Sequence, residues 1–192
     1  MFQKLFDRTL ALAGHRHALP SLAVVAFIES SIFPVPPHLM LAPMVLARPE
    51  RAWRIAAVCT LASVLGGLFG YAIGYFLFDV AGEPIIAAYG FEEQFARFRA
   101  GYNEWGAWIV ALFGATPFPY KVITIASGVT QLNLVTFTLA SLASRGFTFF
   151  LIAALLKYFG PPMQAFIEKR LGLMITIVFL AVIGGVVALK YL

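Results

Sequence analysis

Five long apolar stretches, separated by short charged segments, account for most of the chain. A helix needs roughly 20 residues to cross a bilayer. Residues 55–78 and 171–189 approach or exceed that length without a charge, and residues 134–156 exceed it with Arg145 as the only charge. The pattern therefore predicts a transmembrane helix over each of these three ranges.

The other two stretches, residues 18–47 and 105–131, are apolar but interrupted by prolines. The interruptions consist of Pro34, Pro36 and Pro37 in the first stretch and of Pro117 and Pro119 in the second. Proline removes a backbone donor and ends a helix, and a broken backbone inside a bilayer is tolerated only where protein or a water-filled cavity covers it. Each stretch is therefore either a kinked span or a re-entrant hairpin that leaves on the side it entered.

The charged flanks favour the hairpin. Residues 4–16 and 48–54, on the two sides of the first broken stretch, both carry an excess of basic residues. A crossing would place one of these groups outside, against the positive-inside rule, whereas a hairpin keeps both in the cytoplasm. The basic residues within 157–170 favour a hairpin over 105–131 in the same way. The first hairpin is predicted to enter from the cytoplasm and the second from outside.

These elements form an inverted repeat of two units, each a re-entrant hairpin followed by a transmembrane helix. Superposing Pro34-Val35-Pro36 on Pro117-Phe118-Pro119 also places His38 on Lys121. Inverted repeats whose interrupted helices meet near the midplane are a recurring transporter architecture. The repeat predicts a polar site where the two breaks meet.

The remaining segments complete a single all-α integral membrane domain over residues 1–192. Two amphipathic stretches, residues 1–17 and 84–104, predict short helices in the membrane interface. Residues 79–104 carry an excess of acidic residues, which places them on the outer side. Residues 171–189 add a C-terminal transmembrane helix after the repeat.

The composition agrees with a polytopic membrane protein. The chain is 61% hydrophobic and 12% charged, with a mean hydropathy of +0.87, which no soluble core of 192 residues requires. The net charge of +5 comes from the segments between helices, so topology explains it better than nucleic-acid binding does.

Four polar side chains at membrane depth are the candidates for function, because charge in a bilayer is costly. Glu29 is either a proton site, with Ser30 beside it in a hydrated pocket, or a structural counter-ion of Arg145. Lys121 either helps to hold an anion at the second break or extends to the interface. Arg145, near the middle of its span, is assigned a binding role or a pairing with Glu29. His38 is either functional or a hydrogen-bonding residue.

Signals for an enzyme, a cofactor or a metal site are absent from the sequence. There is no Gly-x-Ser-x-Gly motif, no His-Glu-x-x-His motif and no phosphate-binding glycine loop. We therefore expect a protein that is not an enzyme and that uses no cofactor.

Gly66, Gly70 and Gly74 recur every fourth residue, which predicts a face where another helix packs closely.

The motifs together resemble the DedA family, also called the SNARE-associated or VTT-domain superfamily. The resemblance rests on the order of these motifs across residues 19–160: Phe27-Ile28-Glu29, Phe33-Pro34-Val35-Pro36-Pro37, the glycine-rich Gly66–Tyr75, Pro117-Phe118-Pro119-Tyr120-Lys121, Ser127-Gly128 and Arg145-Gly146. The chain looks closest to the YqaA-like branch. Many members have a second acid in place of His38 and an arginine in place of Lys121.

The resemblance implies a lipid transporter or scramblase in the bacterial inner (plasma) membrane. Members are linked to undecaprenyl phosphate recycling, phospholipid scrambling and proton-dependent homeostasis. The implied partners are membrane lipids, a phosphate-bearing lipid substrate and protons, and a homo-oligomer stays open. The residues expected to bind or move the substrate are Glu29, Ser30, Pro36, His38, Pro119, Tyr120, Lys121 and Arg145.

Two alternatives to lipid transport stay open from the residues. The same cavity at the midplane could carry a small solute or an ion. The protein could also be a membrane assembly factor that transports nothing, in which case Glu29 and Arg145 should tolerate neutral replacement.

Overall fold

The structure is a computed structural model, and it describes residues 18–32, 36–116 and 118–162. Every regular element within these ranges is a helix, which confirms the all-α class. The predicted interfacial helix over 1–17 and the predicted span over 171–189 lie outside the described residues, as do Pro34 and Pro117.

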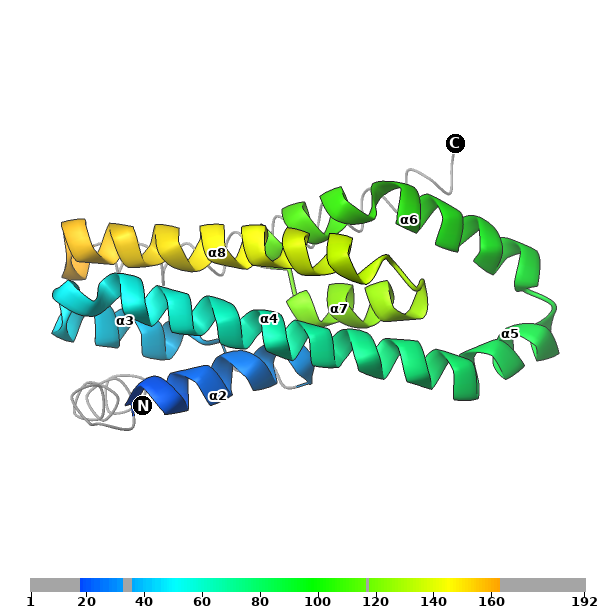
Figure 1. Cartoon of the computed structure of the whole chain (residues 1–192), viewed down its shortest axis with the longest axis horizontal. Coiled ribbons are helices and arrows are strands. Elements are labelled where there is room, and N and C mark those ends of the chain that lie inside the picture. The colour runs from blue at the N-terminus through cyan, green and yellow to red at the C-terminus, as the bar shows by residue number, and fades with distance from the viewer. Residues whose placement is uncertain (1–17, 33–35, 117, 163–192) are drawn as a thin grey trace.

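The first half of the chain doubles back before it forms its long helix. Helix α2 (Ala18–Ser31) runs from one end of the bundle to its middle, and α3 (His38–Ala47) returns to the same end (Figure 1). A 3₁₀ turn, η1 (Pro49–Arg51), then leads into α4 (Ala52–Leu77). The proline-rich break separates the two short helices, as expected from residues that cannot continue a helix.

The second half repeats this path from the opposite end. Helix α4 continues through a π-helical turn, η2 (Phe78–Gly82), into α5 (Glu83–Tyr89). Helix α6 (Glu92–Ala115) then runs back to the middle, α7 (Tyr120–Val129) returns, and α8 (Leu134–Phe159) runs from the turn after α7 to the end of the bundle where α3 lies (Figure 1). Each half thus contains two helices separated by a proline break and followed by a long helix, while the re-entrant inverted repeat stays a prediction. How either pair of helices lies in a bilayer stays a prediction.

The boundaries around the second break differ from those that we predicted. The stretch 84–104 is not one helix, because Gly90 adopts a left-handed conformation (φ 66°) that ends α5. Helix α6 then crosses position 105 without a break and ends at Ala115, just before the prolines. The change from polar to apolar sequence near Trp105 is therefore not a helix boundary.

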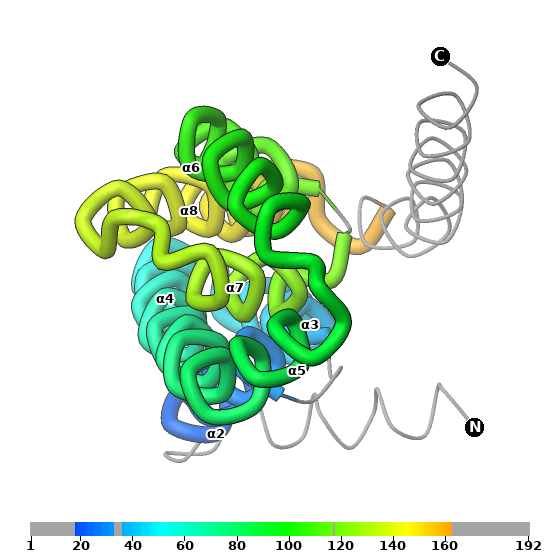
Figure 2. The backbone as a smooth tube through the Cα atoms, turned by 90° about the vertical axis from the view of Figure 1, so that its right-hand side faces the viewer, coloured from blue at the N-terminus to red at the C-terminus, as the bar shows by residue number. Residues whose placement is uncertain are grey.

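Helix α4 contacts α2, α3, α7 and α8, and so connects the two halves of the bundle. It packs against α2, α7 and α8, and an end-on view shows α2 and α7 on its sides (Figure 2). The predicted close-packing face of α4 is confirmed. A Cβ atom on Gly66 would overlap the backbone carbonyl of Phe27 in α2, and one on Gly74 would overlap that of Ile125 in α7.

Two apolar clusters fill the bundle, one in each half. The first joins α2 and α3 to the start of α4 and the end of α8, and it includes Leu22, Leu41 and Phe149. The second joins α6 and α7 to the start of α8, and it includes Val110 and Phe137. The polar residues described below lie between these clusters.

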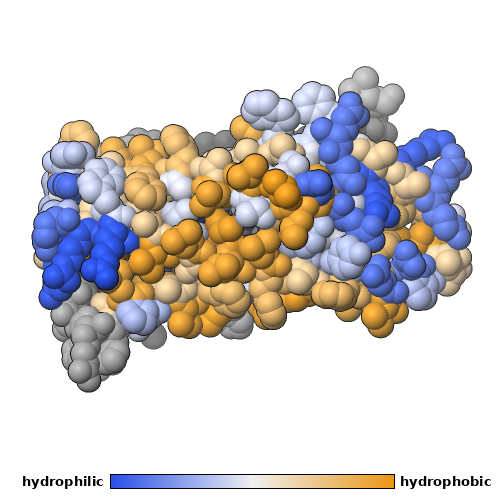
Figure 3. All heavy atoms as spheres, viewed as in Figure 1, coloured by the Kyte–Doolittle hydropathy of each residue, from blue (hydrophilic) through white to orange (hydrophobic). Residues whose placement is uncertain are grey.

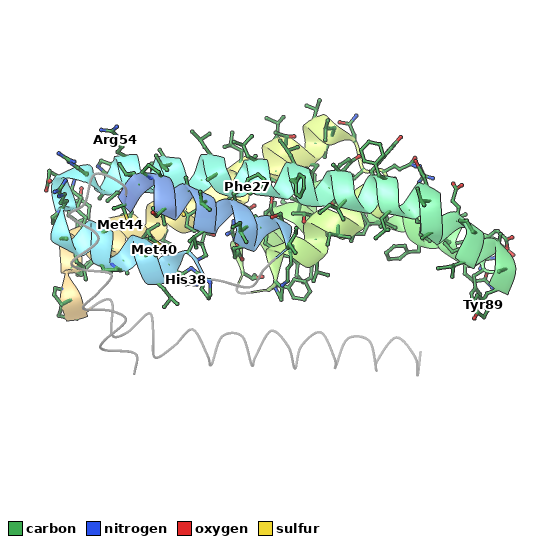
Figure 4. All side chains as sticks on the ribbon, turned by 90° about the horizontal axis from the view of Figure 1, so that it is seen from below. Phe27, His38, Met40, Met44, Arg54 and Tyr89 are labelled. Atoms are coloured by element: carbon green, nitrogen blue, oxygen red, sulfur yellow. The ribbon has the colours of Figure 1, made fainter. Side chains whose placement is uncertain are left out.

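Two of the described helices have the length and composition of membrane spans. One is the continuous helix over Pro49–Tyr89 and the other is Leu134–Phe159. Apolar side chains cover the middle of the face in Figure 3, and hydrophilic ones gather toward the two ends. Arg54 marks one end and Tyr89 the other (Figure 4). This distribution is typical of a bundle that lies across a bilayer.

Candidate functional site

An ion pair joins the two halves of the fold. Arg145 Nη2 on α8 donates to Glu29 Oε2 on α2 over 3.1 Å. The side chains are 7% and 18% exposed, respectively, so both charges are largely removed from solvent. Arg145 lies between the two apolar clusters, since α8 contributes Ala140 to the second cluster and Phe149 to the first. A charge in such surroundings is stable only when it is paired.

Two serines close this pair into a ring of hydrogen bonds. Arg145 Nε donates to Ser63 Oγ over 2.7 Å, and Ser63 Oγ lies 2.7 Å from Ser30 Oγ. Ser30 Oγ in turn donates to Glu29 Oε2 over 3.1 Å. Because the Ser30 hydrogen is used on Glu29, Ser63 must donate to Ser30 while it accepts from Arg145. The donors of the ring thus point from Arg145 toward the Glu29 carboxylate, either directly or through Ser63 and Ser30.

The plane of the guanidinium is held between aromatic rings. The Arg145 Cζ atom lies 4.8 Å from the centroid of Tyr120 and 4.7 Å from that of Phe149. Both rings are fully buried, and a desolvated cation over a ring gains more than an exposed one. The guanidinium is therefore fixed in position as well as neutralised.

The side chain of Lys121, a residue of α7, reaches the C-terminal end of α2. Its Nζ atom donates to the backbone oxygen of Ile32 over 3.4 Å, where α2 has ended and its last carbonyls lack helical partners. A cation is also favourable at the negative end of the helix dipole. Lys121 therefore links the second break to the first.

The other predicted site residues have different surroundings. His38 is the first residue of α3 (Figure 4), and its Nδ1 atom is buried without a hydrogen bond to a described residue. Pro36 is exposed, and its carbonyl accepts from the backbone of Leu39 at the start of α3. Pro119 has the same role before α7, where its carbonyl accepts from Val122. The structure thus gives both prolines a role in starting helices.

The reasoning from sequence missed Ser63. A hydroxyl in an apolar span is common, and it is usually bonded to its own helix, as Thr60 Oγ1 is to the Ala56 carbonyl. The available signal was its position: Ser63 lies four residues before Gly67, next to the face on which α2 and α7 pack closely. A hydroxyl on such a face can reach a neighbouring helix.

We expect Ser63→Ala to lower the free energy of unfolding by about 1–3 kcal/mol, because it leaves the buried Arg145 Nε donor unpaired. Thr60→Ala is the matched control, since it removes a buried hydroxyl of the same helix that donates to its own helix backbone. The measurement is unfolding of the purified protein in mixed micelles. Equal losses in the two variants would contradict a special role for Ser63.

Comparison with known proteins gives one family. The sequence profile described as the VTT domain matches residues 33–158. An uncharacterised protein of Haemophilus influenzae is 35% identical over 185 residues, which cover 96% of each chain. An uncharacterised protein of Histophilus somni is 34% identical over 171 residues, which cover 89% of each chain. No solved structure matches the chain.

Proposed function

Because the chain belongs to the VTT-domain family, we propose that it moves a phosphate-bearing lipid between the leaflets of the bacterial inner membrane. The family match confirms the resemblance that the proline, glycine and arginine motifs predicted. With two apolar helices long enough to span a bilayer, the chain is a membrane protein of the DedA type. The YqaA-like branch, the multi-pass topology and the lipid substrate belong to the proposal.

The observation that carries the proposal is the Glu29–Arg145 ion pair between two apolar clusters. A purely structural contact between helices needs no charge there, and apolar side chains of similar volume often stabilise a fold as well or better. Ionisable residues at membrane depth commonly mark a path for a substrate or a proton. The pair also connects α2 with α8, so breaking it would free the two halves to move apart.

Arg145 is the residue in this proposal that binds the lipid phosphate. Guanidinium groups bind phosphate oxygens through paired N–H donors. Nε and Nη2 are already bonded to Ser63 and Glu29, whereas Nη1 makes no hydrogen bond to a described residue. The acyl chains would stay in the bilayer, so only the headgroup requires polar partners. Lys121 adds positive charge at the break where the headgroup would enter.

Glu29 would couple this binding to protons. Its carboxylate and a phosphate compete for the same guanidinium, so a neutral Glu29 favours the lipid. By linkage, lipid binding then favours protonation of Glu29. The sequence had indicated a hydrated proton site rather than a dry pair. The ion pair is compatible with Glu29 as both a counter-ion and a proton site. Glu29 pairs with Arg145 while it is charged, and its protonation would release Arg145.

The test is a flipping assay in proteoliposomes with labelled lipids that carry a panel of headgroups, run beside soluble anions. We expect transport of phosphate-bearing lipids, and we expect Arg145→Ala to reduce it at least about tenfold, the effect of losing a charged hydrogen bond. Lys121→Arg should retain some transport because it keeps the charge. Arg97→Ala is the control, since Arg97 is 79% exposed and pairs with Glu93 on the surface.

Three results of this assay would overturn the proposal. Movement of soluble anions without lipids would indicate a small-solute transporter. Normal transport by a well-expressed Arg145→Ala variant would remove the phosphate-binding role of Arg145, and inactivity of the wild type with every substrate would favour an assembly factor.

A further inference from the structure

Two buried hydroxyl groups without a hydrogen bond lie on adjacent helices beside Arg145. Tyr120 Oη on α7 and Ser141 Oγ on α8 are fully buried, and neither makes a hydrogen bond to a described residue. The two hydroxyls face each other closely enough for a weak hydrogen-bonding interaction, but the geometry of a formed hydrogen bond is not met. Ser141 precedes Arg145 by one helical turn, so both are on one face of α8.

Other hydroxyls of the bundle are bonded. On α8, Ser144 Oγ donates to the Ser141 carbonyl over 3.2 Å. Among the tyrosines, Tyr71 Oη donates to the Leu132 carbonyl over 2.7 Å, and Tyr102 Oη lies 3.0 Å from Ser127 Oγ. An unmade hydrogen bond in a buried place is destabilising and requires an explanation. Tyr120 and Ser141 are therefore exceptions that meet at one point.

We propose that the hydroxyls of Tyr120 and Ser141 form, with Arg145, a binding site for a phosphoryl oxygen of the substrate. This inference rests on the proposed function: it gives Tyr120 a specific role and adds Ser141 to the binding site. Each hydroxyl has one hydrogen to donate, and the non-bridging oxygens of a phosphate accept several such bonds. The guanidinium supplies the charge, while the hydroxyls supply direction and discriminate against headgroups without an acceptor at that position.

Two glycines lie close to the Tyr120 ring. A Cβ atom on Gly67 of α4 would lie 3.0 Å from Tyr120 Oη, and one on Gly114 of α6 would lie 3.4 Å from Tyr120 Cε2. At these two positions the neighbouring helices thus present backbone to the ring. Because both hydroxyls are fully buried here, the proposed site requires Arg145 to leave Glu29 before a ligand can reach it.

The test uses binding rather than transport, with dodecyl phosphate as the probe in detergent solution. Tyr120→Phe and Ser141→Ala should each weaken its affinity, measured by titration calorimetry, about tenfold, the equivalent of one hydrogen bond. Neither variant should lower the unfolding temperature, because neither hydroxyl makes an internal bond. Ser144→Ala is the matched control on the same helix, and its affinity should be unchanged.

The outcomes separate this site from the proposed function. Affinity that depends on both hydroxyls, in a protein that moves no lipid, would support the site and overturn the transport proposal. Equal hydroxyl-dependent binding of inorganic phosphate would support the site with a soluble ligand. Wild-type affinity in both variants would overturn the inference. So would a loss of stability at unchanged affinity, because it would show that the two hydroxyls bond to each other.

Discussion

Glu29→Gln is expected to lower the free energy of unfolding by about 3–5 kcal/mol, the usual effect of removing one partner of a buried ion pair. The glutamine keeps the volume and one acceptor oxygen, so the loss comes from the Arg145 charge that is left without a counter-charge. With Glu29 only 18% exposed, solvent compensates for little of this charge. The measurement is unfolding in mixed micelles at neutral pH.

Glu93→Gln is the matched control for this variant. Glu93 pairs with Arg97 one turn later on α6, and the two side chains are 75% and 79% exposed. Exposed pairs of this kind contribute between 0 and about 1 kcal/mol. If the two variants lost the same stability, the Glu29–Arg145 pair would not be a buried one in the membrane-extracted protein.

A second replacement separates the stability of the pair from its use in transport. Combining Glu29→Gln with Arg145→Gln removes both charges and should restore part of the lost stability. Transport should stay lost, because the phosphate no longer has a cation to bind. Restored transport would overturn the role of Arg145 as the cation that binds the phosphate.

The proton role of Glu29 has its own signature in transport. If protonation releases Arg145, then a Glu29→Gln protein that remains folded resembles the protonated state, and its transport rate should no longer depend on pH. An unchanged pH profile at matched protein levels would leave Glu29 as a structural partner only. Glu29→Asp keeps the charge but shortens the side chain, so it should weaken the 3.1 Å contact with Arg145 more than it weakens proton binding.

The charged half of the site could be predicted from the sequence, because charge at membrane depth has few explanations. Glu29 and Arg145 were selected on that ground, and their pairing was one of two alternatives. Ser63 could not be selected in the same way, since a serine in a span is usually bonded to its own helix. Its role depends on how α2, α4 and α8 meet, which is a property of the tertiary packing.

The ends of the helices could also be predicted only in part from the sequence. The prolines fixed the breaks before α3 and before α7, because proline acts on the backbone locally. The change in polarity near Trp105 did not stop α6, since a helix ends at a cap or a breaker and not where its surroundings change. Gly90, which does end a helix, was inside a stretch whose amphipathic pattern predicted one helix. An amphipathic pattern does not show where a helix ends.

Gly66→Leu is expected to have an equally large effect through packing alone. A Cβ atom at this position would overlap the backbone of Phe27, where α2 crosses α4 (Figure 4). A flexible side chain could move aside, but a helix backbone cannot without displacing α2. Overpacking typically lowers stability by about 1–3 kcal/mol, and by more where the backbone must shift. We therefore expect a loss of at least about 3 kcal/mol.

The same displacement should disturb the site, because Phe27 is two residues before Glu29 and three before Ser30. Gly101→Leu is the matched control: Gly101 is within α6, and a Cβ atom there would have no neighbour within 4 Å. Leucine has the higher helix propensity, so this control should gain up to about 1 kcal/mol. Unfolding in mixed micelles measures both variants. If they changed stability alike, the contact between α2 and α4 would not be the close one on which the position of Glu29 depends.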